Sequence, residues 1–357
     1  MVKAGNIGEW SEVYAFLRLL ADGRLYAADE DLNQIREMFL PIIKIIRKEG
    51  KDKHYEYWPN NESAQVEIYL DGKQILKLPA SEFGTEADRL LYSIQTYSEG
   101  SLDVTETRSF IKSIYVEKLK APSTDKSDIK VQLHDVNSGI KRIVGFSIKS
   151  ELGGASTLLN ASLATNFVYK IEGLNPNLMD KINSIDTGGK IQKRVKAIKD
   201  NGGTFTFERT ENETFNNNLK KIDRSMSMVL AEMLLGYFSK EGNSCDKLTK
   251  YVSRVNPLSE DEEFYTYNVK ELLCAVALGM MPATKWSGTD EATGGYIIVN
   301  KRGDVMAFYI FNRDVLKAYL FDNTKFDTPD TVKHRFGCLY EEDGEMRIKL
   351  NLQIRFV

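Results

Sequence analysis

Short turns that end in glycine separate pairs of strand-like runs along this chain. The runs on both sides of each turn are rich in apolar residues, a pattern that favours an antiparallel hairpin. The turns are Asp71-Gly72, Arg302-Gly303 and Asp343-Gly344. Between the hairpins lie stretches with apolar residues at helical spacing, among them 226–239 and 314–321. The chain is therefore predicted to have a mixed α/β or α+β fold, in which helices flank a mixed sheet.

The length of 357 residues allows one large domain or two domains of ordinary size. The segment 32–48 is predicted to be helical, with an interruption or a fresh start near Pro41. After residue 175 the sequence changes character, and a basic helix is the next predicted element. We therefore predict a core over residues 1–175 and a second region over 176–357, and the two can also pack together as one domain.

The composition disfavours several classes of protein. The formal net charge is −3, so the chain does not coat nucleic acid through bulk positive charge, and DNA binding requires basic residues gathered on one face. The cysteines are scattered and form no CxxC pair, which disfavours structural zinc. The sequence shows no leader segment, no apolar run of about 20 residues and no nucleotide-binding motif. We expect a cytoplasmic protein without a membrane span or a nucleotide cofactor.

The stretch 126–150 holds the strongest catalytic candidates. Two strand-like runs, Ile129–Leu133 and Arg142–Ile148, flank a turn rich in Asp, Asn and Gly. Asp128 precedes the first run and Lys149 follows the second, so a hairpin brings an acid and a lysine together at one end. An acid there can hold a hard divalent cation, and a lysine can offset charge that develops on a phosphoryl group. The alternative is that both residues simply mark strand ends in solvent.

A glutamate on the first predicted helix is the next candidate. Glu12 is followed by apolar residues at positions i+3, i+4 and i+7, which places it at the edge of the apolar stripe of that helix. A glutamate that faces a core is unfavourable unless it has a partner or a cation. The alternative is a capping or surface glutamate near the start of the helix.

These residues form a pattern: an aspartate at a strand start, a turn, an apolar strand that ends in x-x-Lys, and a glutamate on an early helix. The pattern resembles the core of the PD-(D/E)XK nucleases. Longer blocks resemble, more narrowly, the HpaII family of type II restriction endonucleases, and this resemblance runs nearly from end to end. The blocks are EWSEVYAFLRLLADGRLYAADEDL, GFSIKSELGGASTLLNAS with ATNFVYKI, ALGMMPATKWSGTDEATGGYIIV and KLNLQIRF.

The resemblance implies Mg2+-dependent hydrolysis of phosphodiester bonds in duplex DNA at a short palindrome, with CCGG as the starting guess. It makes Asp128 the motif aspartate and Lys149 the motif lysine. Ser147 stands where the general nuclease pattern has Asp or Glu, so one metal ligand has to come from elsewhere. The candidates for that ligand are Glu12 first, Glu151 second, and the backbone carbonyl of Ile148.

Residues near the C-terminus are candidates for contact with DNA. Polar and apolar residues alternate over 347–356, so one face of a predicted final strand is apolar and the other carries three cations, two amides and no acid. Such side chains suit base edges and phosphates, and the alternative is an ordinary solvated sheet face. The candidates are Arg347, Lys349, Asn351, Gln353 and Arg355, with Arg335 in the long loop 324–337.

The expected partner is double-stranded DNA. Because a palindrome is most simply read by a protein with two-fold symmetry, we expect a homodimer as a hypothesis. One rival is a non-catalytic DNA-binding or regulatory protein that retains the nuclease fold, and Ser147 is the residue that favours it. Another is a protein-interaction module, which predicts neither DNA cleavage nor salt-sensitive DNA binding.

Overall fold

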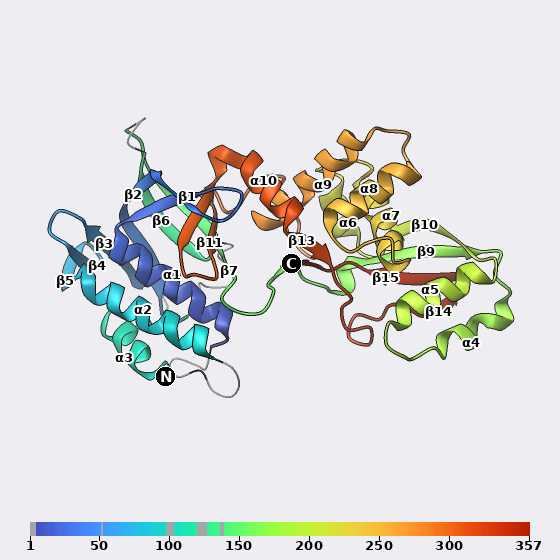
Figure 1. Cartoon of the computed structure of the whole chain (residues 1–357), viewed down its shortest axis with the longest axis horizontal. Helices are drawn as coiled ribbons and strands as arrows, with labels where there is room; N and C mark the ends of the chain where they lie inside the picture. The colour runs from blue at the N-terminus through green and yellow to red at the C-terminus, as the bar shows by residue number, and fades with distance from the viewer. Residues whose placement is uncertain (1–4, 51–52, 98–101, 103, 120–126, 136–138) are drawn as a thin grey trace. The chain divides into compact units, whose positions relative to one another are not determined.

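The computed structural model describes residues 5–50, 53–97, 102, 104–119, 127–135 and 139–357 (Figure 1). Contacts between residues divide the chain into two compact units. Unit 1 combines residues 1–156 with 290–316, and unit 2 combines 157–289 with 317–357. This division differs from a boundary near residue 175, because the hairpin around Gly303 returns to the sheet of the first unit.

Unit 1 is built on a sheet of nine strands. In spatial order the strands are β1 (Arg24–Ala28), β12 (Val305–Tyr309), β11 (Gly295–Val299), β7 (Lys141–Ser150), β6 (Ile129–His134), β2 (Gln34–Glu49), β3 (Lys53–Asn60), β4 (Gln65–Leu70) and β5 (Lys73–Pro79). Because β1 pairs with β2 as well as with β12, the six strands from β1 to β2 close into a barrel. The pairing of β7 with β11 is parallel, and its pairing with β6 is antiparallel.

Helices cover one face of this sheet. Figure 1 shows α1 (Ile7–Asp22) and α2 (Ala80–Thr96) side by side across it, with α3 (Thr105–Ser113) next to α2. At the start of α1, the Asn6 side chain accepts a hydrogen bond from the backbone N–H of Glu9 at 2.9 Å, and the Glu9 carboxylate accepts one from the N–H of Asn6 at 3.1 Å. This reciprocal capping box fixes where the helix begins. The apolar side chains of α1 then pack on those of the sheet in one core.

The prediction of a helix over 32–48 is wrong, because this segment forms the long strand β2. Its second half is rich in isoleucine, a β-branched residue that packs well on a pleated surface. Pro41 lies where β2 changes partners: Arg24 of β1 lies opposite Pro41, and the next residue, Ile42, lies opposite Leu133 of β6. The change of partner explains why a proline occurs within so long a strand.

Unit 2 contains two smaller sheets and several helices. The first sheet has the order β10 (Thr204–Thr210), β9 (Asn166–Glu172), β15 (Glu345–Asn351) and β14 (Leu339–Glu342). The second has the order β13 (Thr324–Phe326), β16 (Ile354–Phe356) and β8 (Thr157–Leu159). The helices are α4 (Met179–Asn183), α5 (Lys190–Asp200), α6 (Glu213–Leu219), α7 (Met226–Phe238), α8 (Cys245–Val255) and α9 (Glu262–Ala277).

The mixed α+β class predicted from the sequence is confirmed. The predicted hairpins around Gly72, Gly303 and Gly344 are present as β4–β5, β11–β12 and β14–β15. The helix α10 (Arg313–Asp322) matches the prediction over 314–321, and its residues are divided between the two units. In the described part of the chain, no helix combines the length and the apolar character that a membrane span needs.

Candidate active site

The hairpin predicted within 126–150 is present as β6 and β7, although residues 136–138 of its turn lie outside the described residues. At the start of β6, the N–H of Asp128 donates to the carbonyl of Phe146 at 2.9 Å. The Asp128 carboxylate accepts a hydrogen bond from the N–H of Ile148 at 2.7 Å. Asp128 therefore contacts β7 through both its backbone and its side chain, at the strand position just before Lys149.

The carbonyl of Ile148 lies on the same strand edge as its N–H. In a strand, both polar groups of one residue point toward the same neighbour. The N–H of Ile148 points toward the Asp128 carboxylate, and regular pairing of β6 with β7 has already ended at Ile129 and Phe146. The Ile148 carbonyl consequently lies on the same edge of β7 as that carboxylate, beyond the first residue of β6.

A cavity of about 710 Å3 joins the end of β7 to the start of α1. Glu12 of α1 lines it, and Ile148, Lys149 and Ser150 line it from β7. Glu12 and Lys149 are both half-buried. The structure thus brings three predicted residues, Glu12, Ile148 and Lys149, to one cavity, and Asp128 contacts Ile148.

The other two candidates from the sequence lie beside this cavity. Ser147 pairs with Tyr296 of β11 in the parallel ladder. The N–H of Glu151 donates to the carbonyl of Val299 at 2.9 Å, which extends the pairing with β11 by one residue. Neither residue is among the described residues that line the cavity. Within the described residues, no three His, Cys, Asp or Glu side chains gather as a metal cluster.

The sequence of the whole chain was compared with known proteins. A family model described as HpaII restriction endonuclease matches residues 6–356. The chain belongs to the HpaII restriction endonuclease family. A relative named "Type II restriction enzyme HpaII", from Haemophilus parainfluenzae, is 40% identical over 361 residues, which cover 99% of each chain. No solved structure matches this protein significantly. The resemblance seen in the sequence blocks is confirmed, and the chain is a type II restriction endonuclease by family.

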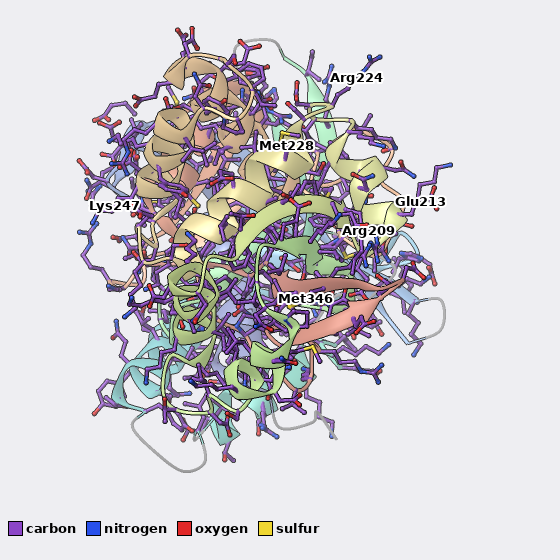
Figure 2. All side chains as sticks on the ribbon, turned by 90° about the vertical axis from the view of Figure 1, so that its right-hand side faces the viewer. Arg209, Glu213, Arg224, Met228, Lys247 and Met346 are labelled. Carbon is purple, nitrogen blue, oxygen red and sulfur yellow. The ribbon has the colours of Figure 1, made fainter. Side chains whose placement is uncertain are left out.

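For this member of the HpaII family, the expected DNA contacts of the last strand need revision, because acids surround Arg347. Its guanidinium lies 2.7 Å from Glu208 of β10 and 3.1 Å from Glu345 at the start of β15. Only 6% of the Arg347 side chain is exposed. Residues 347–356 contain no acid, as the sequence shows, but Glu208 of a neighbouring strand and Glu345 at the start of β15 lie beside Arg347. Figure 2 marks Arg209 and Met346 on this sheet, and Arg209 also pairs with Glu208, at 3.0 Å.

Two more candidates of β15 are engaged within unit 2. The Lys349 ammonium pairs with the carboxylate of Glu211. Asn351 is fully buried, and its amide nitrogen donates to the carbonyl of Ser162 at 2.8 Å and to the side chain of Asn166 at 2.6 Å. A contact between Asn351 and DNA would require these buried hydrogen bonds to break.

The predicted final strand is in fact two strands. It breaks at 352–353, so that β15 belongs to one sheet and β16 to another. Gln353 lies at the break and is half-buried, and Arg355 of β16 pairs with Asp327 at 3.0 Å. Arg335 is exposed in the loop before β14, with a φ of +51°. Among the six candidates, Arg335 is exposed, and Lys349, Gln353 and Arg355 are half-buried.

Sequence reasoning did not single out part of the cavity wall. Arg108 of α3 lines the cavity, as do Gly153 and Gly154 in the loop after β7. The glycine pair at 153–154 and the residues around Arg108 do not indicate in the sequence that they meet at one cavity. Trp10 also lines the cavity and is fully buried.

Proposed function

We propose that this protein cuts duplex DNA at a short palindromic site by Mg2+-dependent phosphodiester hydrolysis, with a PD-(D/E)XK-like site in unit 1. The observation that carries the proposal is the grouping of Asp128, Ile148, Lys149 and Glu12 at the end of β7. Membership of the HpaII restriction endonuclease family supports the same reaction.

The oxygen donors at this site fit a magnesium ion. The Asp128 carboxylate and the Ile148 carbonyl face one strand edge, and the Glu12 carboxylate lines the adjoining cavity. All three donors are oxygens, which Mg2+ prefers, and Mg2+ usually needs only one or two carboxylates because it keeps several waters. These three residues would hold the ion, with Glu151 as the second choice for the other acid. When bound there, Mg2+ lowers the pKa of its water and offsets charge on the phosphate.

Lys149 is the cation of the site. Within the part of the chain that the structure describes, its side chain makes no hydrogen bond or ion pair. Its ammonium group is thus available to stabilise the negative charge that develops on the attacked phosphoryl group. Ser147, on the same strand, takes no carboxylate role and acts at most as a hydrogen-bond donor near the site.

The DNA-recognition role of the second part of the chain remains part of the proposal. Arg335 and Gln353 are our first candidates for contact with DNA, followed by Lys349 and Arg355, whose ion pairs lie at the protein surface. Arg347 and Asn351 instead stabilise the sheet to which they belong, through their ion pairs and buried hydrogen bonds. A homodimer that reads a palindrome, with CCGG as the first sequence to try, completes the proposal for this cytoplasmic enzyme.

Incubation of supercoiled plasmid DNA with the protein, with and without Mg2+, tests the proposed function. We expect linear or fragmented DNA only in the presence of Mg2+. Salt-sensitive binding without cleavage in Mg2+ would favour a non-catalytic DNA-binding protein. If neither binding nor cleavage occurs, a protein-interaction module becomes the better description.

A further inference from the structure

A buried hydrogen-bond donor lies at the cavity and has no partner. Trp10 of α1 is 0% exposed, and its indole Nε1–H donates to no residue that the structure describes. Most buried polar groups in proteins are paired, because an unpaired one loses its bond to water without replacement. An indole N–H is only a donor, so the missing partner must be an acceptor.

The indole nitrogen faces the wall of the cavity at Gly5. A Cβ atom built on Gly5 would lie only 3.0 Å from Trp10 Nε1, and Gly5 itself lines the cavity. The same point lies 2.4 Å from Leu119 Cδ1 and 3.0 Å from Glu9 Oε2, so only glycine fits at position 5, between the indole N–H and these two side chains. Glycine permits this close approach of the indole to the backbone at the cavity wall.

The surroundings of this N–H favour an anion. The guanidinium carbon of Arg108 lies 5.3 Å from the centre of the Trp10 ring, and Arg108 lines the same cavity. The first turn of α1, with its positive dipole, opens onto the cavity at Asn6 and Ile7. Two acids lie nearby. The Glu9 carboxylate accepts a hydrogen bond from the N–H of Asn6 as part of the helix cap, and Glu12 lines the cavity as a proposed ligand of the metal ion.

We infer that Trp10 and Arg108 bind a phosphate of the DNA backbone other than the one that is hydrolysed. The inference rests on the proposed function. A phosphate oxygen accepts the hydrogen bond of the indole, and a guanidinium is the cation best suited to phosphate. Because Glu12 and Lys149 line the same cavity, a strand fixed at Trp10 and Arg108 is positioned relative to the metal-binding end of β7. Trp10 and Arg108 are therefore positioning residues, not catalytic residues.

The first experiment measures binding in Ca2+ to a duplex that carries the sequence cut by the wild-type protein. Trp10→Phe keeps the ring and loses the N–H, and it should weaken binding about tenfold or more. Trp58→Phe is the matched control. The Trp58 indole donates to Glu56 at 3.1 Å, and the Lys44 ammonium lies 4.8 Å from its ring, but Trp58 does not line this cavity. We expect the control to bind DNA as the wild type does.

The second experiment locates the phosphate. Each phosphate of the duplex in turn is replaced by a neutral methylphosphonate, and binding is measured for wild type and Trp10→Phe. We expect one position, distinct from the cut phosphate, at which the replacement weakens wild-type binding but adds little to the loss in Trp10→Phe. In Arg108→Gln, methylphosphonate at the same position should likewise add little to the loss of binding. The slope of log affinity against log salt concentration should fall by about 1 in this variant.

Melting temperatures without DNA separate this inference from a purely structural role. If the indole N–H binds an acceptor within the protein, Trp10→Phe lowers the melting temperature and leaves the DNA affinity of the folded protein unchanged, which overturns the inference. Equal methylphosphonate profiles in wild type and both variants also overturn it. Failure of the wild-type protein to bind or cut any duplex is a different result, because it removes the proposed function itself.

Discussion

The carboxylate of Asp128 accepts a hydrogen bond from the backbone N–H of Ile148 at 2.7 Å. Just before β6 begins, a side-chain oxygen thereby replaces the backbone acceptor that a longer β6 would offer to β7. The same contact sets the acid next to the residue that precedes Lys149. One side chain is consequently expected to serve both the local structure of the hairpin and the chemistry of the site.

Two substitutions of Asp128 separate those roles. Asp128→Asn keeps an oxygen that can accept from Ile148, so its melting temperature should stay near that of the wild type, but cleavage should disappear because the negative charge is gone. Asp128→Ala loses both, and it should also cost about 1–3 kcal/mol of folding stability. Plasmid cleavage and thermal melting measure the two effects. Cleavage by Asp128→Asn at nearly the wild-type rate would remove Asp128 from the site.

Lys149→Met tests the cation of the site, since methionine keeps a long apolar stem without the charge. We expect the rate of cleavage to fall by about 10²–10³, with DNA affinity in Ca2+ reduced much less, because the ammonium acts on the transition state. Single-turnover cleavage and equilibrium binding distinguish the two. A variant that loses affinity and rate in the same proportion would mean that Lys149 only binds the DNA backbone.

Glu12→Ala and Glu9→Ala form a matched pair on one helix. Glu9 belongs to the capping box of α1, so its removal should cost about 1 kcal/mol of stability with little loss of activity. Glu12 lines the cavity with Lys149, so its removal should abolish most cleavage and raise the Mg2+ concentration needed for the remainder. Equal, small losses in both variants would instead point to Glu151 as the second acid.

Arg347→Met tests whether the last long strand is structural. The hydrogen bond from Arg347 holds the pKa of the Glu208 carboxyl below its usual value. A carboxyl with a lowered folded-state pKa stabilises the protein above its unfolded pKa of about 4.3, and this contribution disappears as the pH falls through the folded-state value. Arg347→Met should therefore lower the melting temperature near neutral pH and flatten the loss of stability toward pH 3. Unchanged melting with relaxed DNA specificity would restore Arg347 as a base-reading residue.

Local patterns in the sequence predicted the hairpins and the meeting of Asp128 with the end of β7, because period-two alternation and turn residues act over short distances. The same reasoning failed for β2, where isoleucines at several spacings suit a helix as well as a strand. Only pairing with β1, β6 and β3, from distant parts of the chain, decides between the two.

Contacts between distant strands explain the other differences. The alternation over 347–356 does not reveal that glutamates of β10 and β14 lie beside Arg347, or that the strand breaks before Gln353. In the same way, the sequence around Trp10 does not reveal that its indole N–H lies beside Gly5 at the cavity wall.

Digestion of a long DNA of known sequence, followed by sequencing of the fragment ends, addresses the activity of this protein most directly. With Mg2+, the wild-type protein should give discrete fragments whose ends all fall at one short palindrome, and Asp128→Asn should give none. Ends scattered without a common sequence, uncut DNA, or the same fragments from Asp128→Asn would contradict a site-specific nuclease built on the end of β7.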